Sequence, residues 1–149
     1  MTNNAEVLNS IRRIALTAPD APSLLPEVVK LLQRERPHYH WVGVYLLQGQ
    51  ELVLGPYVGK PTPHTRIPLN KGICGAAASS GETIIVDDVN SDPRYLACSL
   101  ETRSEIVVPI KRQGRILGEM DVDSDVPAAF TNDDRDLLEA VAELLAGKI

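Results

Sequence analysis

The two cysteines of the chain, Cys74 and Cys98, are its candidate nucleophiles. Cys98 lies in a long irregular stretch, residues 88–100, and loops of that length inside a compact domain are often functional. A thiol exposed there becomes a strong nucleophile when neighbouring groups lower its pKa. From the sequence alone, a small buried side chain is an equally good interpretation of Cys98.

Cys74 lies within Gly72-Ile73-Cys74-Gly75, at the predicted start of a short helix. The free N–H groups and the dipole of a helix N-terminus favour an anion, such as a thiolate or a substrate carboxylate. Tight packing of a glycine-flanked turn against a sheet explains the same four residues somewhat better when Cys74 is considered alone.

Three acidic residues are candidates for binding a cation or moving a proton. Asp121 and Asp123 come at the end of a predicted strand, where alternation places both side chains on one face. Two carboxylates side by side require a cation, a shared proton or solvent, and a ligand ammonium would serve. Glu105 begins the strand predicted to pair with this one, so it can face the same space. For any one of these acids, solvation at a strand end remains the simpler interpretation.

Aromatic residues are scarce, and two of them fall on one predicted face. Trp41 and Tyr45 are four residues apart on the first predicted strand, in a chain with one Trp, four Tyr and one Phe. They could wall a pocket for a methyl group, a thioether or a cation, although core packing explains them equally well. None of the three histidines has metal-ligand spacing with either cysteine, so we expect no metal site and no cofactor.

The composition excludes several classes of protein. A chain of 149 residues suits one domain with a real core. The net charge is −5 and the charged residues are mixed along the chain, so we expect no nucleic-acid partner. No apolar run approaches the roughly 20 residues that span a bilayer, and the polar N-terminus lacks the apolar core of a signal peptide. Two cysteines are too few for a secreted disulfide scaffold, so we expect a cytoplasmic protein without membrane partners.

The hydrophobic pattern predicts an α+β fold. Apolar residues at helical spacing predict two N-terminal helices, with Ser23 as the N-cap of the second. Four segments rich in β-branched residues predict two hairpins, 41–47 with 51–58 and 105–111 with 115–122. A capping signal at Thr131 starts the last helix. We therefore expect a central antiparallel sheet with the N- and C-terminal helices on one face and a ligand pocket on the other.

Taken together, these segments resemble the GAF-domain free methionine-(R)-sulfoxide reductases, from about Trp41 to the last helix. The Gly-Pro-Tyr block, the cysteine loop and the Asp-x-Asp-Ser ending are more particular to the reductases than the fold and glycine spacing that GAF domains share. The resemblance implies that residues 1–149 form a single, PAS-like GAF domain. It rests on the segments Trp41–Tyr45, Leu54–Lys60, Arg66–Pro68, Lys71–Gly75, Asp87–Val89, Ala97–Cys98, Ser104–Pro109 and Gly118–Ser124.

The resemblance implies a catalytic set. Cys98 matches the family's catalytic cysteine, Cys74 matches a second family cysteine, and Glu105 matches an acid that supplies protons. The implied reaction is thiolate attack on the sulfoxide of free methionine sulfoxide. It leaves a sulfenic acid, which condenses with a thiol. Cys74, a thioredoxin-type protein or a small-molecule thiol would resolve that sulfenic acid.

The resemblance also implies the substrate-binding residues. Trp41 and Tyr45 match the aromatic wall around the sulfoxide methyl group. Glu105, Asp121 and Asp123 match the acids that hold the substrate ammonium. A homodimer is possible for this fold.

The chain departs from the family pattern at two places. The family usually has a third cysteine just before Arg-Ile-Pro, which commonly forms a disulfide with the catalytic one. Here that segment is one residue longer and His64 lies about where the cysteine would be, so the usual disulfide cannot form. Glu119 replaces a usually apolar residue and has no assigned role. Two alternatives therefore stay open: a GAF module that binds a small molecule without converting it, and a redox sensor or thiol peroxidase that uses Cys98.

Overall fold

The computed structural model describes residues 2–97 and 99–149, which form a six-stranded sheet and four α-helices. The helices are α1 (Asn4–Thr17), α2 (Ala21–Glu35), α3 (Gly72–Ser80) and α4 (Asn132–Ala146), and a 3₁₀ turn, η1, spans Val89–Ser91. The strands are β1 (Trp41–Gln48), β2 (Glu51–Val58), β3 (Arg66–Pro68), β4 (Ile84–Val86), β5 (Ser104–Arg112) and β6 (Arg115–Ser124). The sheet order is β3-β2-β1-β6-β5-β4, with every neighbouring pair antiparallel.

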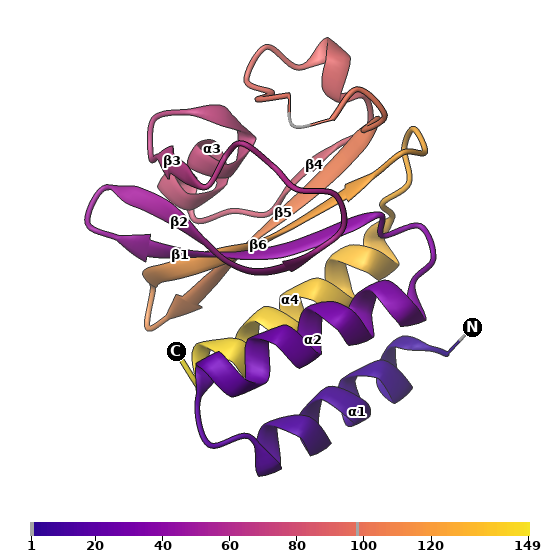
Figure 1. The fold of residues 1–149 in the computed structure, drawn as a ribbon, viewed down its shortest axis with the longest axis vertical. Helices are drawn as coiled ribbons and strands as arrows, with labels where there is room; N and C mark the ends of the chain where they lie inside the picture. Colours follow the sequence, from indigo (N-terminus) through magenta and orange to yellow (C-terminus); the bar gives the residue numbers. More distant parts are fainter. Residues whose placement is uncertain (1, 98) are drawn as a thin grey trace.

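The sheet has a helical layer on one face and irregular structure on the other. Helices α1, α2 and α4 lie together on one side, whereas α3 and the loop that contains η1 lie on the opposite side (Figure 1). The predicted α+β architecture, with both hairpins and the terminal helices on one face, is confirmed. The face opposite the terminal helices is left for a site.

Strand alternation gives the two faces of the sheet different characters. Val44 on β1 pairs with Met120 on β6, and both are fully buried in the apolar core that includes the terminal helices. Their chain neighbours Tyr45 and Glu119 pair with each other and point to the opposite face. The same two-residue period places Asp121 on that face, so β6 is apolar toward the helices and acidic away from them.

The helix starts are fixed by short side-chain acceptors. The prediction of Ser23 as the cap of α2 was wrong, because the N-cap is Asp20, whose side chain accepts a hydrogen bond from the Ser23 N–H at 3.0 Å. The helix α4 begins after Thr131, as predicted, and the Asp134 carboxylate accepts a hydrogen bond from the Thr131 N–H at 2.9 Å. None of the helices in the described part of the chain is both long and apolar enough to cross a membrane.

Gly118 permits the close approach of β6 to β1 that this architecture needs. A Cβ atom at this position would lie 2.2 Å from the carbonyl oxygen of Tyr45. Because that obstacle is backbone, we expect Gly118→Ala to separate the strands and lower the free energy of unfolding by about 1–3 kcal/mol. Urea denaturation measures this, with Gly147→Ala as the control because its Cβ would approach nothing closer than 3.5 Å. Equal midpoints for Gly118→Ala and the wild type would contradict the close approach.

Candidate functional site

The three predicted acids converge on the face of the sheet opposite the terminal helices. Glu105 on β5 pairs in register with Asp123 on β6, and Asp121 lies one alternation step further along the same strand. Their exposed fractions are only 4%, 3% and 3% for Glu105, Asp121 and Asp123. The structure therefore buries carboxyl groups that the simpler interpretation of the sequence would have left in solvent.

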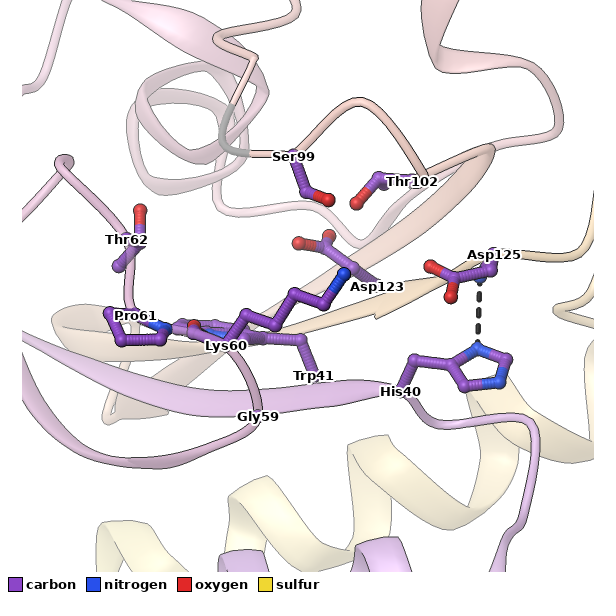
Figure 2. A pocket seen from close by; sticks show the side chains of 10 residues that line it. All are labelled: His40, Trp41, Gly59, Lys60, Pro61, Thr62, Ser99, Thr102, Asp123 and Asp125. Carbon is purple, nitrogen blue, oxygen red and sulfur yellow. Dashed lines mark hydrogen bonds between the residues drawn. The ribbon is translucent and has the colours of Figure 1, made fainter.

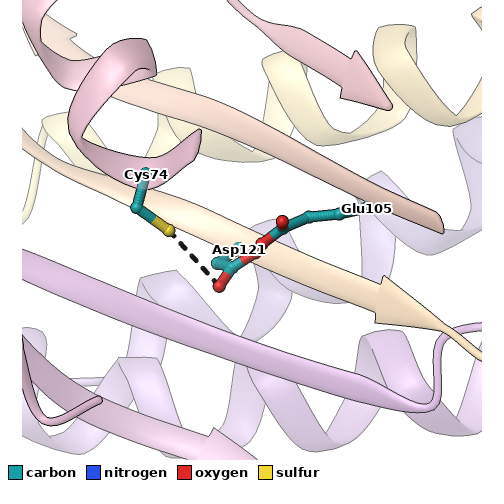
Figure 3. A group of neighbouring side chains, drawn as sticks. All are labelled: Cys74, Glu105 and Asp121. Carbon is teal, nitrogen blue, oxygen red and sulfur yellow. Dashed lines mark hydrogen bonds between the residues drawn. The ribbon is translucent and has the colours of Figure 1, made fainter. Parts of the chain in front are cut away.

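Helix α3 brings Cys74 against two of these acids. The Cys74 Sγ donates a hydrogen bond to Asp121 Oδ2 at 3.4 Å, and Figure 3 shows the thiol pointing from the helix toward that carboxylate. One ligand atom each from Cys74, Glu105 and Asp121 lies within 4.8 Å of the others. That spacing would accommodate a small cation, a metal ion or an ammonium group alike. The expectation of no metal site rests on histidine spacing and does not address this group.

Burial and mutual repulsion set the protonation of the cluster. Burial raises the pKa of Glu105 well above its usual range, and the neighbouring Asp121 and Asp123 raise it further. Burial also raises the pKa of Asp121, but hydrogen bonds with Glu105 and Cys74 and the nearby His64 oppose that shift. Glu105 therefore keeps its proton more readily than Asp121, so one carboxyl can donate a proton while its neighbour accepts one.

The Cys74 thiol is a poor nucleophile as it stands. Burial raises its pKa well above the ordinary value, and the charges of Asp121, Glu119 and Glu105 add to that shift. A buried cysteine among acids is held as the neutral thiol, which is the inert form. For Cys74 to react, its proton must pass to a base, and Asp121 is already its hydrogen-bond acceptor.

Glu119, to which the sequence assigned no role, is a fourth buried acid on this face. It is 0% exposed, and neither carboxylate oxygen forms a hydrogen bond of ordinary geometry with the described residues, although the Cys74 thiol lies near enough to affect its pKa. Burial raises its pKa well above the usual range, the Cys74 thiol opposes the shift and Asp121 reinforces it. An unpartnered buried carboxyl group destabilises the folded state.

The two predicted aromatic residues form a wall beside the acids. The Trp41 and Tyr45 rings share this face, with centroids 6.5 Å apart. The Trp41 ring lies over Gly43, where an added Cβ would come within 2.3 Å of it. Tyr57 on β2 stacks on Trp41 at 5.5 Å, a contact that the sequence did not predict because it depends on the register of β1 against β2, which shifts between Gly43 and Tyr45.

Both aromatic residues also hold the segment between β2 and β3. The Trp41 Nε1–H donates to the Lys60 carbonyl oxygen at 3.0 Å, and the Tyr45 hydroxyl donates to the His64 carbonyl oxygen at 2.7 Å. The wall residues thus fix, near its two ends, the segment that contains His64.

Two of the cavities are bordered by the predicted site residues. The larger, of about 320 Å³, is bounded by Trp41, Lys60, Ser99, Thr102 and Asp123 among others (Figure 2). The smaller, of about 20 Å³, is bounded by Tyr45, His64, Cys74, Leu96, Glu105 and Asp121 among others. Ligand pockets usually measure about 300–1,000 Å³, whereas the smaller space suits one water-sized group. The predicted substrate-binding residues are therefore divided, with Trp41 and Asp123 on the larger cavity and the rest on the smaller.

The predicted catalytic residue Cys98 lies outside the described residues. The described residues close to it in the sequence border both cavities, Leu96 the smaller one and Ser99 the larger one. His64 Nε2 lies 3.0 Å from the Ala97 carbonyl oxygen, so the β2–β3 segment contacts the cysteine loop directly.

The fold corresponds to a known class of domain. Residues 20–149 match the GAF domain family. The free methionine-R-sulfoxide reductase of Saccharomyces cerevisiae is 44% identical over 110 residues, which are 71% of this chain and 61% of that protein. The structure of the type II free methionine-R-sulfoxide reductase from Thermoplasma acidophilum is 41% identical with a TM-score of 0.84, covering 85% of this chain and 90% of that one.

A third relative matches nearly the whole chain. The free methionine-R-sulfoxide reductase from Neisseria meningitidis, solved in complex with its substrate, is 37% identical with a TM-score of 0.92 and covers 97% of this chain and 87% of that one. The chain belongs to the free methionine-R-sulfoxide reductase family of GAF-domain proteins.

Replacing Glu119 with leucine should stabilise the protein. Removing an unpartnered buried carboxyl is expected to raise the free energy of unfolding at neutral pH by about 1–3 kcal/mol. The pKa of Glu119 is raised above 4.5 in the folded state, so the unfolded chain loses that proton first and wild-type stability falls as the pH rises above 4.5. The advantage of Glu119→Leu should therefore grow from about pH 4 to about pH 8 in urea titrations.

The exposed Glu143 on α4 provides the control. Glu143→Leu should change the free energy of unfolding by no more than about 0.5 kcal/mol. If the wild type were as stable as Glu119→Leu across the whole pH range, the cost of burying the Glu119 carboxyl group would be offset by other interactions, and the prediction would be wrong.

Proposed function

We propose that this protein reduces free L-methionine-(R)-sulfoxide to methionine. The observation that carries the proposal is the convergence of Glu105, Asp121 and Asp123 beside the Trp41–Tyr45 wall on one face of the sheet. A zwitterion with a methyl sulfoxide side chain has an ammonium for such acids and a methyl group for such a wall. The free methionine-R-sulfoxide reductases that the chain resembles support the same substrate.

Cys98 is the proposed nucleophile, and Glu105 the proposed acid. The Cys98 thiolate attacks the sulfoxide sulfur, and a carboxyl group protonates the sulfoxide oxygen as its bond to the substrate sulfur breaks. Glu105 suits this role because its raised pKa keeps it protonated near neutral pH. The oxygen forms a bond to the Cys98 sulfur as the bond between the two sulfurs breaks, so the substrate sulfur is reduced by two electrons, Cys98 becomes a sulfenic acid, and methionine leaves.

Regeneration requires a second thiol. Cys74 is the proposed resolving residue: its sulfur attacks the Cys98 sulfenic acid, a disulfide forms and water leaves. Because burial raises the pKa of Cys74, the attack needs a base, and Asp121 Oδ2 at 3.4 Å is placed to take the thiol proton. A thioredoxin-type protein or a small-molecule thiol then reduces the disulfide.

A binding module without turnover is the second candidate function. The observation that favours it is His64 on the small cavity, about where the family's usual third cysteine would lie. In that case the same acids and aromatic wall would bind free methionine sulfoxide without changing it. Substitution of Cys98 distinguishes the two functions. In a reductase it should abolish turnover, whereas in a binding module it should have no effect on binding.

The first test measures methionine released from free methionine-(R)-sulfoxide in the presence of dithiothreitol. We expect turnover by the wild type, none by Cys98→Ser, and none with the (S) epimer, because Cys98 is the nucleophile and the pocket is chiral. Isothermal titration calorimetry checks that Cys98→Ser still binds the substrate. Folded, fully reduced wild-type protein that binds the (R) epimer without releasing methionine would support the binding module instead.

The second test identifies the resolving thiol by intact-protein mass after one equivalent of substrate without reductant. The wild type should lose two hydrogens as a disulfide forms, and Cys74→Ser should gain one oxygen as a trapped sulfenic acid. Dithiothreitol should still support turnover by Cys74→Ser, since an external thiol can reduce the sulfenic acid directly. A wild type that also retains the added oxygen would exclude Cys74 as the resolving residue.

A further inference from the structure

The larger cavity carries charges of both signs. Asp123 borders it from β6, and Lys60 reaches into it from the segment between β2 and β3 (Figure 2). His40 also borders the cavity, but its Nδ1 accepts a hydrogen bond from the Asp125 N–H at 2.9 Å and so is not available to a ligand. Lys60 is thus the permanently charged basic group among the described residues that line this cavity.

The backbone of Lys60 is held in place, whereas its amino group makes only a weak contact. Its carbonyl oxygen accepts the Trp41 indole N–H at 3.0 Å, so its backbone is held beside the aromatic wall. Its Nζ lies 3.0 Å from Glu101 Oε1, and the two side chains are 69% and 55% exposed. Ion pairs this exposed contribute little to stability, so the amino group can exchange Glu101 for a ligand at small cost.

We propose that Lys60 binds the α-carboxylate of the substrate while Asp123 binds its α-ammonium. This inference rests on the proposed function and deepens it by assigning the other half of the amino-acid head group. The ammonium and carboxylate of a free amino acid are attached to one carbon, and Asp123 and Lys60 present an acidic and a basic side chain to one cavity. A charge-assisted hydrogen bond in this partly enclosed space is stronger than the exposed pair with Glu101.

This arrangement selects a free amino acid at two points. A methionine sulfoxide residue within a peptide offers amides at both positions, so it would leave Lys60 and Asp123 without charged partners. The cavity would therefore reject it twice, by loss of the ammonium and by loss of the carboxylate.

The test compares two substrates in Lys60→Met. For free methionine-(R)-sulfoxide we expect KM to rise about 10- to 100-fold with kcat nearly unchanged, as for lost uniform binding. For 3-(methylsulfinyl)propylamine, which has the ammonium but no carboxylate, we expect the same kcat/KM in the variant and the wild type. Lys60→Arg should restore most of the affinity for the amino acid.

Two control variants separate carboxylate binding from loop stability. Lys30→Met removes a lysine of similar exposure, 62%, from the opposite side of the sheet and should leave KM unchanged. Glu101→Gln breaks the same ion pair and keeps Lys60, so KM should stay the same or fall. If Glu101→Gln raised KM as much as Lys60→Met, or if Lys60→Met affected both substrates equally, the assignment would be wrong.

The inference and the proposed function fail in different ways. Lack of wild-type turnover overturns only the reductase proposal. In that case, calorimetric dissociation constants of the same variants for the same two compounds test the carboxylate assignment. An unchanged dissociation constant for methionine sulfoxide in Lys60→Met would overturn it.

Discussion

The site depends on the burial of several carboxyl groups beside one another. Glu105, Glu119 and Asp121 lie on one face of the sheet, and the ion pairs formed by the described residues include none of them. Charged carboxylates cannot share such a space, so burial and repulsion raise their pKa values. Protonation relieves the repulsion among these groups, and a ligand ammonium would relieve it as well.

The central strands β1 and β6 stabilise this arrangement, because one face of each strand packs in the apolar core and the other face lines the site. Toward the terminal helices they contribute residues such as Val44 and Met120, which are fully buried in an apolar layer. Toward the site the same strands contribute Tyr45 and the acids. Because one backbone carries both sets, the apolar layer fixes the positions of the polar groups, and a frame of this kind holds reacting groups better than a loop.

Features that depend on local residue periodicity could be predicted from the sequence. Features that depend on contacts between distant segments could not. Alternation alone placed Asp121 and Asp123 on one face, and the hairpins and last helix follow from equally local signals. The burial of Glu119 could not be predicted, because it depends on the packing of α3 over β6. The division of the site into two cavities and the position of Lys60 depend on how the β2–β3 segment folds back. The role of Cys98 remains a prediction.

The hydrogen bonds from the aromatic wall have a consequence for how this protein can vary. Trp41 and Tyr45 each hold a backbone carbonyl oxygen, one at Lys60 and the other at His64, and neither bond requires a particular side chain there. The chain between these two anchors can lengthen or shorten while the wall stays in place. An extra residue between Lys60 and His64 therefore changes only the segment that borders the site. Evolution can alter this segment independently of the acids on the sheet.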